Sequence, residues 1–181
     1  VMSATGQTTR EHLAGLLALT AEALQSPAFV PDEANKLKRE WLADIEQGRT
    51  DPDAIARRAL GRLNNPYPHG DVRYVSTIDE DLADVKAVTP AAMKAFHDKF
   101  YGGAHSQLAV VGDFDPVAVR AQLATLFGHW TTGTPYARVP HPLVPNKAVA
   151  LTFATPDKAN ATLRGVLAAP VNDRAKDFAA L

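Results

Sequence analysis

Residues 89–127 decide the fold that we expect for this chain, and they read TPAAMKAFHDKFYGGAHSQLAVVGDFDPVAVRAQLATLF. Thr89-Pro90 and Asp115-Pro116 are each typical of a helix start, because proline at the first helical position lacks only an N–H that would be unpaired anyway. We therefore expect one helix from Thr89 to about residue 100 and another from Asp115 to about residue 127.

A short apolar stretch lies between these two helices. Residues 106–112 read SQLAVVG, are β-branched near their end and are followed by an aspartate. Such a run, bounded by turn-forming residues, is typical of a buried strand. We expect residues 108–111 to be the central buried part of that strand.

Four more helices are expected upstream of residue 89, each introduced by an N-terminal capping signal. The signals are the capping-box patterns Thr8-x-x-Glu11 and Thr77-x-x-Glu80, Asp32 after Pro31, and Asp51-Pro52. The corresponding helices are expected at residues 9–25, 78–86, 32–48 and 51–64.

The sequence changes in character after residue 130. Four prolines between residues 131 and 145 predict an extended linker, which we place at residues 131–147. Residues 148–154 (AVALTFA) and 161–169 (ATLRGVLAA) predict two strands, and Asn172 or Asp173 is expected to cap a last helix. The predicted fold class is α+β, with a helix-rich subdomain and an antiparallel sheet at residues 1–130 and the truncated start of a similar subdomain at residues 148–181.

Composition excludes several classes of function. The chain has 181 residues, with 19 Lys+Arg against 20 Asp+Glu and a net charge of −1, so we expect no broad nucleic-acid surface. Cysteine is absent, which removes disulfides, thiolate catalysis and cysteine-ligated metals. No apolar run approaches the roughly 20 residues of a membrane span.

The six histidines give no metal motif by their spacing. None pairs with another within one helical turn, and the nearest approach to H-x-x-E-H, at residues 8–12, has threonine at the first ligand position. His97 is expected at an exposed or half-packed aromatic position. A metal-binding hydrolase that uses His69 with Asp44 and Glu46 stays open as a minor alternative, although carboxylates on an amphipathic helix usually form a solvated face.

The order of three longer phrases resembles the pitrilysin/insulinase family of zinc metallopeptidases, which includes the mitochondrial processing peptidases. These phrases lie at residues 19–60, at residues 65–74 (NPYPHGDVRY) and at residues 81–130, and the resemblance covers about residues 13–130. The segment from residue 155 onward is also similar to the opening of the next subdomain in bacterial members.

The resemblance implies a clamshell of two related halves around a chamber, with a processing-peptidase-like fold. It implies that H-x-x-E-H binds zinc in the active half, with a glutamate on a later helix as third ligand. That position falls at Asp44 here, with Glu46 near it; both are weak metal candidates, since aspartate is a methylene shorter than the usual glutamate. The motif itself is expected upstream of residue 1.

The resemblance then leaves two interpretations, a fragment of the active half that lacks the motif or a fragment of the inactive half. Asp44, the string PYPHG at residues 66–70 and the stretch at residues 70–81 favour the inactive half of a bacterial zinc metalloendopeptidase, with no catalytic residue in this chain. Its implied partners are the active half, in the same or another chain, and a peptide substrate, and its zinc is implied in that active half. The alternative is a noncatalytic scaffolding or assembly subunit of the processing-peptidase type. Substrate-binding residues and compartment, periplasm or cytoplasm, stay open.

Overall fold

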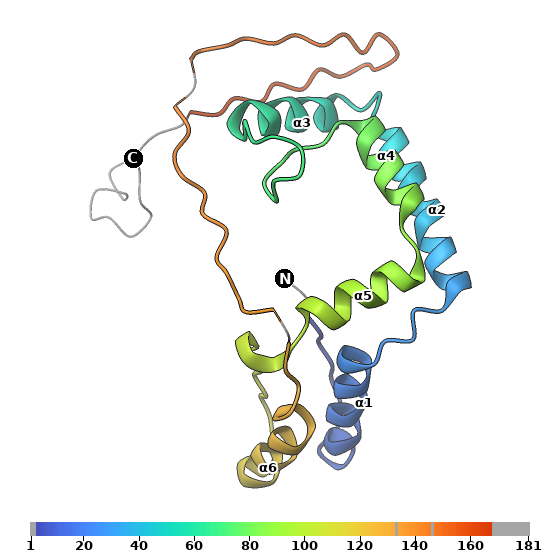
Figure 1. Cartoon of the computed structure of the whole chain (residues 1–181), viewed down its shortest axis with the longest axis vertical. Helices are drawn as coiled ribbons and strands as arrows, with labels where there is room; N and C mark the ends of the chain where they lie inside the picture. The colour runs from blue at the N-terminus through green and yellow to red at the C-terminus, as the bar shows by residue number, and fades with distance from the viewer. Residues whose placement is uncertain (1–2, 133, 146, 168–181) are drawn as a thin grey trace. The chain divides into compact units, whose positions relative to one another are not determined.

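The computed structural model describes residues 3–132, 134–145 and 147–167 (Figure 1). The regular secondary structure of these residues consists of helices. Six α-helices lie where the sequence predicts them. Their bounds are α1 Leu13–Gln25, α2 Pro31–Gln47, α3 Pro52–Asn64, α4 Ile78–Ala87, α5 Pro90–Phe100 and α6 Pro116–Phe127, with short 3-10 helices η1 at Arg10–His12 and η2 at Gly103–His105.

The three N-caps that precede proline form as expected. The side chain of Asp51 accepts a first-turn backbone N–H of α3 at 2.7 Å, and that of Thr89 accepts one of α5 at 3.1 Å. Asp115 accepts two from α6, at 2.8 and 3.2 Å. Each cap satisfies donors that the first helical turn leaves without an intrahelical partner.

Only one of the two expected capping boxes forms. At α4 the Thr77 hydroxyl accepts from the Glu80 N–H at 3.2 Å, and the Glu80 carboxylate accepts from the Thr77 N–H at 2.7 Å. The box expected at Thr8 and Glu11 is wrong. There the N-cap of η1 is Thr9, whose hydroxyl lies 2.9 Å from His12 Nδ1 and caps no backbone N–H.

The expected α+β class with an antiparallel sheet is wrong for the described residues, none of which lies in a strand. The three segments expected as strands are extended but form no backbone ladder with another segment. They are residues 106–111, residues 147–154 and the described part of residues 161–169. Val111 is 95% exposed, so residues 108–111 are not a central buried strand. A strand is held by hydrogen bonds to a neighbour, which these segments lack, whereas a helix satisfies its own backbone. The expected helix at Asn172 or Asp173 lies outside the described residues.

The chain divides into two units, which we describe separately. Unit 1 comprises residues 1–34 and 88–137, and unit 2 comprises residues 35–87 and 138–181. In unit 1, α1 packs against α6, and two glutamines tie the helices together. Gln25 donates to the Leu126 carbonyl and Gln122 donates to the Ala14 carbonyl, each at 2.8 Å.

The best buried side chains of the described residues all lie in unit 1. Leu17 and Ala21 are 6% and 4% exposed and lie one turn apart on α1, and His97 of α5 is 8% exposed. Residues four apart share a helix face, so α1 turns one face toward its neighbours. The packed part of unit 1 is therefore small and centres on α1.

Two backbone positions shape the connections of unit 1. Phe29, between α1 and α2, has φ 44°, in the left-handed region that side chains seldom adopt. Gly102, after α5, lies so close to residues 131–132 that an added Cβ would be 2.8 Å from the Thr132 nitrogen. Gly102 therefore permits a close backbone approach as well as ending the helix.

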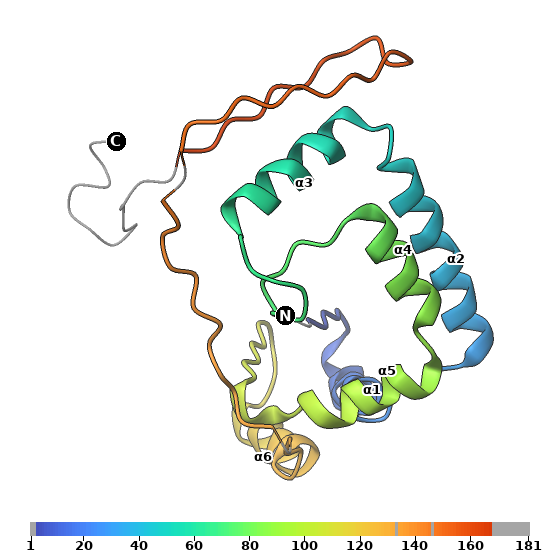
Figure 2. The same ribbon diagram turned by 45° about the horizontal axis from the view of Figure 1, so that its top comes forward.

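Unit 2 contains α3, α4, most of α2 and a long extended segment. That segment, residues 147–165, runs out and back beside α3 as two extended stretches joined by a turn near residues 155–158 (Figure 2). We call it the strap. Across both units, no helix among the described residues is long and apolar enough to cross a membrane.

Candidate functional site

The two carboxylates at the predicted metal position do not converge on a common point. Asp44 and Glu46 are both exposed near the end of α2. Arg49 donates to both carboxylate oxygens of Glu46, at 2.8 and 3.2 Å, and these hydrogen bonds lower the pKa of Glu46. Arg49 also reaches Asp79 at 2.8 Å. A guanidinium thus occupies both carboxylate oxygens of Glu46.

His69 lies against an aromatic ring. Its recorded contacts include neither Asp44 nor Glu46. Its imidazole meets the ring of Tyr74 edge-on, with centroids 5.3 Å apart. Within the described residues, no three histidine, aspartate or glutamate side chains gather closely enough to hold a metal ion. The residues of this chain therefore do not fit the zinc site that the resemblance suggested at Asp44 and Glu46, and we derive no metal chemistry from them.

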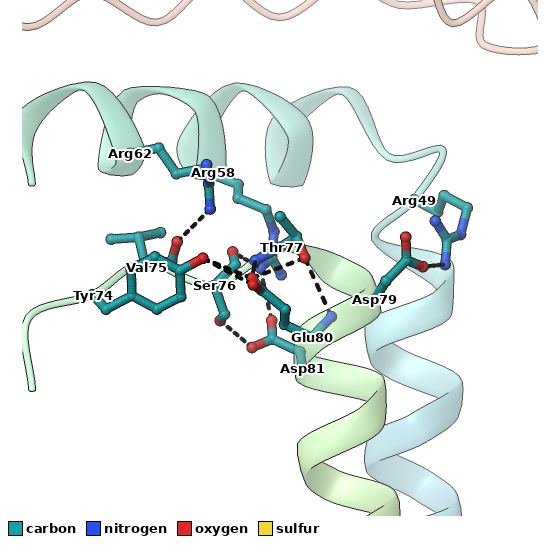
Figure 3. Close-up of polar contacts among 10 residues, drawn as sticks. All are labelled: Arg49, Arg58, Arg62, Tyr74, Val75, Ser76, Thr77, Asp79, Glu80 and Asp81. Carbon is teal, nitrogen blue, oxygen red and sulfur yellow. Dashed lines mark hydrogen bonds and ion pairs between the residues drawn. The ribbon is translucent and has the colours of Figure 1, made fainter. Parts of the chain in front are cut away.

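A dense polar cluster surrounds the start of α4 (Figure 3). Glu80 accepts the Tyr74 hydroxyl at 2.9 and 3.0 Å and closes the capping box with Thr77. These bonds lower the pKa of Glu80, with the Thr77 backbone N–H as the largest cause. The carboxylate is therefore committed to fixing the helix start.

Two arginines of α3 join the same cluster from the other side (Figure 3). Arg58 donates to the Ser76 carbonyl at 2.6 Å and to Asp81 at 2.7 Å, and Asp81 also accepts the Ser76 hydroxyl. Arg62 donates to the Val75 carbonyl at 2.6 Å. The cluster holds residues 74–77 between α3 and α4, which is a structural role.

The turn at residues 65–73 carries a second compact set of contacts. Arg73 donates to Asp71 through Nε, Nη2 and its backbone N–H at 2.8–2.9 Å, and its guanidinium lies 3.7 Å from the centroid of the Tyr67 ring. Hydrogen bonds from Arg73 lower the pKa of Asp71 to about 2. Arg73 also donates to the Pro140 carbonyl at 3.1 Å.

His97 is more deeply buried than the sequence predicts, and its contacts are structural. Its Nε2 donates to the Leu24 carbonyl at 2.8 Å, near the end of α1, where helix carbonyls lack intrahelical partners. Its ring stacks on Tyr101 at 5.0 Å and meets Phe29 edge-on at 5.9 Å. Its Nδ1 lies 3.4 Å from Asp98 Oδ1, so both ring nitrogens and the ring itself have recorded partners, and these contacts hold the side chain in a packed position.

A cavity lies in unit 2, between α3 and the strap. It has a volume of about 770 Å³. On the α3 side it is lined by an apolar stripe at helical spacing, and on the strap side by alternate apolar residues of the first extended stretch. The stripe is Ile55, Ala56, Ala59, Leu60 and Leu63, and the strap contributes Val149, Leu151, Phe153 and Leu163 among others.

Sequence reasoning missed this cavity, although half of its signal was present. The apolar positions of α3 recur at intervals of three and four, which marks one face of a helix. What covers that face is the strap, about 90 residues later, and no local pattern connects the two. Within the part of the chain that the structure describes, this cavity has the size of a small-molecule pocket, and its lining mixes apolar side chains with polar ones such as Lys158 and Asn160.

Comparison with known protein families gives one match. The family model described as Peptidase M16 inactive domain matches residues 87–179, just over half of the chain. The matched part runs from the end of α4 through α5 and α6 and includes the strap. Comparisons with curated proteins and with solved structures found no match.

Proposed function

This chain belongs to the family of peptidase M16 inactive domains, and from that membership we propose that it is the noncatalytic part of a bacterial zinc-dependent metalloendopeptidase. In this proposal the active half carries H-x-x-E-H and the zinc ion. The present chain forms part of the wall that encloses the peptide substrate.

The family match over residues 87–179 is the observation that carries the proposal. Two carboxylates of the described residues are already engaged, Glu46 by Arg49 and Glu80 by Tyr74 and Thr77. A carboxylate held in this way is unsuited to take a proton from a metal-bound water, since a general base needs a free acceptor oxygen near the reacting group.

Exposed apolar side chains support a role in which this chain is covered by another polypeptide. On α5 of unit 1, Phe96 and Phe100 are 57% and 46% exposed and their ring centroids lie 4.7 Å apart, so they form a continuous apolar surface. Large apolar surfaces left open on a soluble protein are typical of interaction sites. The proposed cover is the active half, whether it belongs to the same chain or to a separate one.

The test uses the full chain, alone and mixed with the active half from the same source. We expect no hydrolysis of a quenched fluorogenic peptide by the chain alone, formation of a complex by size-exclusion chromatography, and hydrolysis by that complex. Replacing the glutamate of H-x-x-E-H in the active half is expected to abolish turnover. Within this chain, Asp44→Asn and Glu46→Gln are expected to leave the zinc content and turnover of the complex unchanged.

Two results would contradict the proposal. Chelator-sensitive hydrolysis by the chain alone, with about one equivalent of zinc, would identify it as a peptidase in its own right. A complex whose partners all lack H-x-x-E-H and cleave no peptide would favour the alternative, a noncatalytic scaffolding subunit.

A further inference from the structure

The strap, residues 147–165, is held to α3 by one recorded ion pair at its far end. Arg164 donates to a single carboxylate oxygen of Asp53, through Nε at 2.6 Å and Nη2 at 2.5 Å. Asp53 lies in the first turn of α3, and the side chains of Asp53 and Arg164 are 36% and 43% exposed. The contact is therefore within reach of solvent and of dissolved salt.

Asp53 has a second partner that does not depend on the strap. Its other carboxylate oxygen lies 3.0 Å from Nε of Arg57, one turn further along α3. A negative charge in the first turn is also favoured by the helix dipole. When Arg164 leaves, Asp53 keeps both of these interactions, so breaking the tie leaves no unpaired charge on α3.

The apolar contact between the strap and α3 is loose. Val149, Leu151 and Phe153 line the cavity yet remain 57%, 53% and 52% exposed, and the cavity of about 770 Å³ separates them from full contact with the helix. The extended stretches of the strap form no strand ladder. Neither close packing nor backbone pairing therefore fixes the strap in place.

We propose that residues 147–165 form a hinged strap over the apolar stripe of α3. In the closed state Arg164 is paired with Asp53, and in the open state Arg164 has dissociated and Asp53 is paired with Arg57 alone. The strap controls how much of the stripe meets solvent. This inference concerns the chain itself and does not depend on the peptidase role, so either can fail without the other.

The absence of cysteine from the sequence provides a direct test in the full chain. Ala56→Cys places a thiol among the residues that line the cavity, and Ala83→Cys places one at an exposed position on α4 as a matched control. The measurement is the rate of thiol alkylation at each position. Adding Arg164→Gln is expected to raise the rate at position 56 by about 1.5- to 5-fold, the range that an exposed ion pair supports, and to leave position 83 unchanged.

The opposite change is expected from Arg57→Ala. Arg57 neutralises part of the Asp53 charge and, as a like charge beside the same carboxylate, repels Arg164, so its removal strengthens the Arg164–Asp53 pair and favours the closed strap. Raising the salt concentration to about 1 M is expected to speed alkylation at position 56 in the otherwise unaltered chain, since salt screens exposed charges, and to have little further effect with Arg164→Gln. The Arg57→Ala measurement and the salt effect in the otherwise unaltered chain do not depend on how well the Arg164→Gln chain folds.

The proposal is overturned if alkylation at position 56 is equally fast with arginine or glutamine at position 164. It is also overturned if Arg57→Ala speeds the reaction, or if salt accelerates positions 56 and 83 alike. A slower reaction with Arg57→Ala together with a salt effect confined to position 56 would support it.

Discussion

In unit 1, His97 combines deep burial with a hydrogen bond and two aromatic contacts. Its Nε2–H supplies a hydrogen bond to a carbonyl at the end of α1, while the ring fills space between Tyr101 and Phe29. One residue thus joins α5 to α1 by both a polar bond and aromatic packing. Alanine at position 97 removes both contributions, whereas glutamine removes the aromatic ring and keeps an N–H donor.

We expect His97→Ala to lower the free energy of unfolding by about 1–3 kcal/mol, the cost of leaving a buried carbonyl without its donor. His97→Gln, which retains an N–H donor on a side chain of similar reach, is expected to lose less. Urea unfolding followed by circular dichroism measures both. Equal losses for alanine and glutamine would show that the hydrogen bond to Leu24 contributes nothing.

Asp71 makes the stability of unit 2 depend on pH in the acid range. Hydrogen bonds from Arg73 hold the pKa of Asp71 at about 2, below its usual 3.8, so the folded chain binds this proton less tightly than the unfolded chain does. The stabilisation is complete above about pH 4 and is lost as the pH falls toward 2. We expect unfolding titrations across that range to show a smaller acid effect in Asp71→Asn than in the unaltered chain. Identical pH profiles would rule out this contribution.

At the scale of elements, α1 shows how unevenly burial is distributed. Leu17 is 6% exposed and Leu19 is 62% exposed, although both are leucines on the same helix. We expect Leu17→Ala to cost about 2–5 kcal/mol, because it removes buried methyl groups and leaves a cavity. Leu19→Ala is expected to change stability by no more than about 0.5 kcal/mol. Thermal or urea unfolding compares them, and similar costs would contradict the packing described for α1.

The helices could be predicted from the sequence because their start signals are local. Asp51, Thr89 and Asp115 each cap a helix within three residues of their own position, so a short window holds the whole interaction. Thr8 shows the limit of such patterns, since neighbouring Thr9 takes the N-cap position.

The predicted sheet was wrong for the described residues because strand pairing is not a local property. The residues around Val110 have strand-forming composition, but composition specifies no partner, and a strand exists only when another chain segment supplies its hydrogen bonds. Metal binding at Asp44 or Glu46 stays a prediction, and the contacts of Glu46 show a related limit of the sequence. The spacing of these two carboxylates was visible in the sequence, whereas the competing guanidinium of Arg49 and its link to Asp79 depend on the fold.

At the scale of the whole molecule, the described residues bury few side chains completely and leave many large apolar ones open. Within each unit, the recorded contacts are mainly helix caps, side-chain hydrogen bonds and a few packed side chains. In the arrangement proposed above, the active half covers the apolar side chains that this chain leaves exposed, which would account for the small number of buried side chains in a member of this family.

Phe29 carries a consequence for the order in which unit 1 assembles. Its backbone at φ 44° costs about 1–2 kcal/mol for a residue with a side chain, and the ring contact with His97 is the recorded interaction that offsets this cost. His97 reaches that place only after α5 has docked on α1. The turn that leads out of α1 is therefore expected to settle late, together with a helix that follows it by 60 residues, which couples distant parts of the chain into one cooperative folding step.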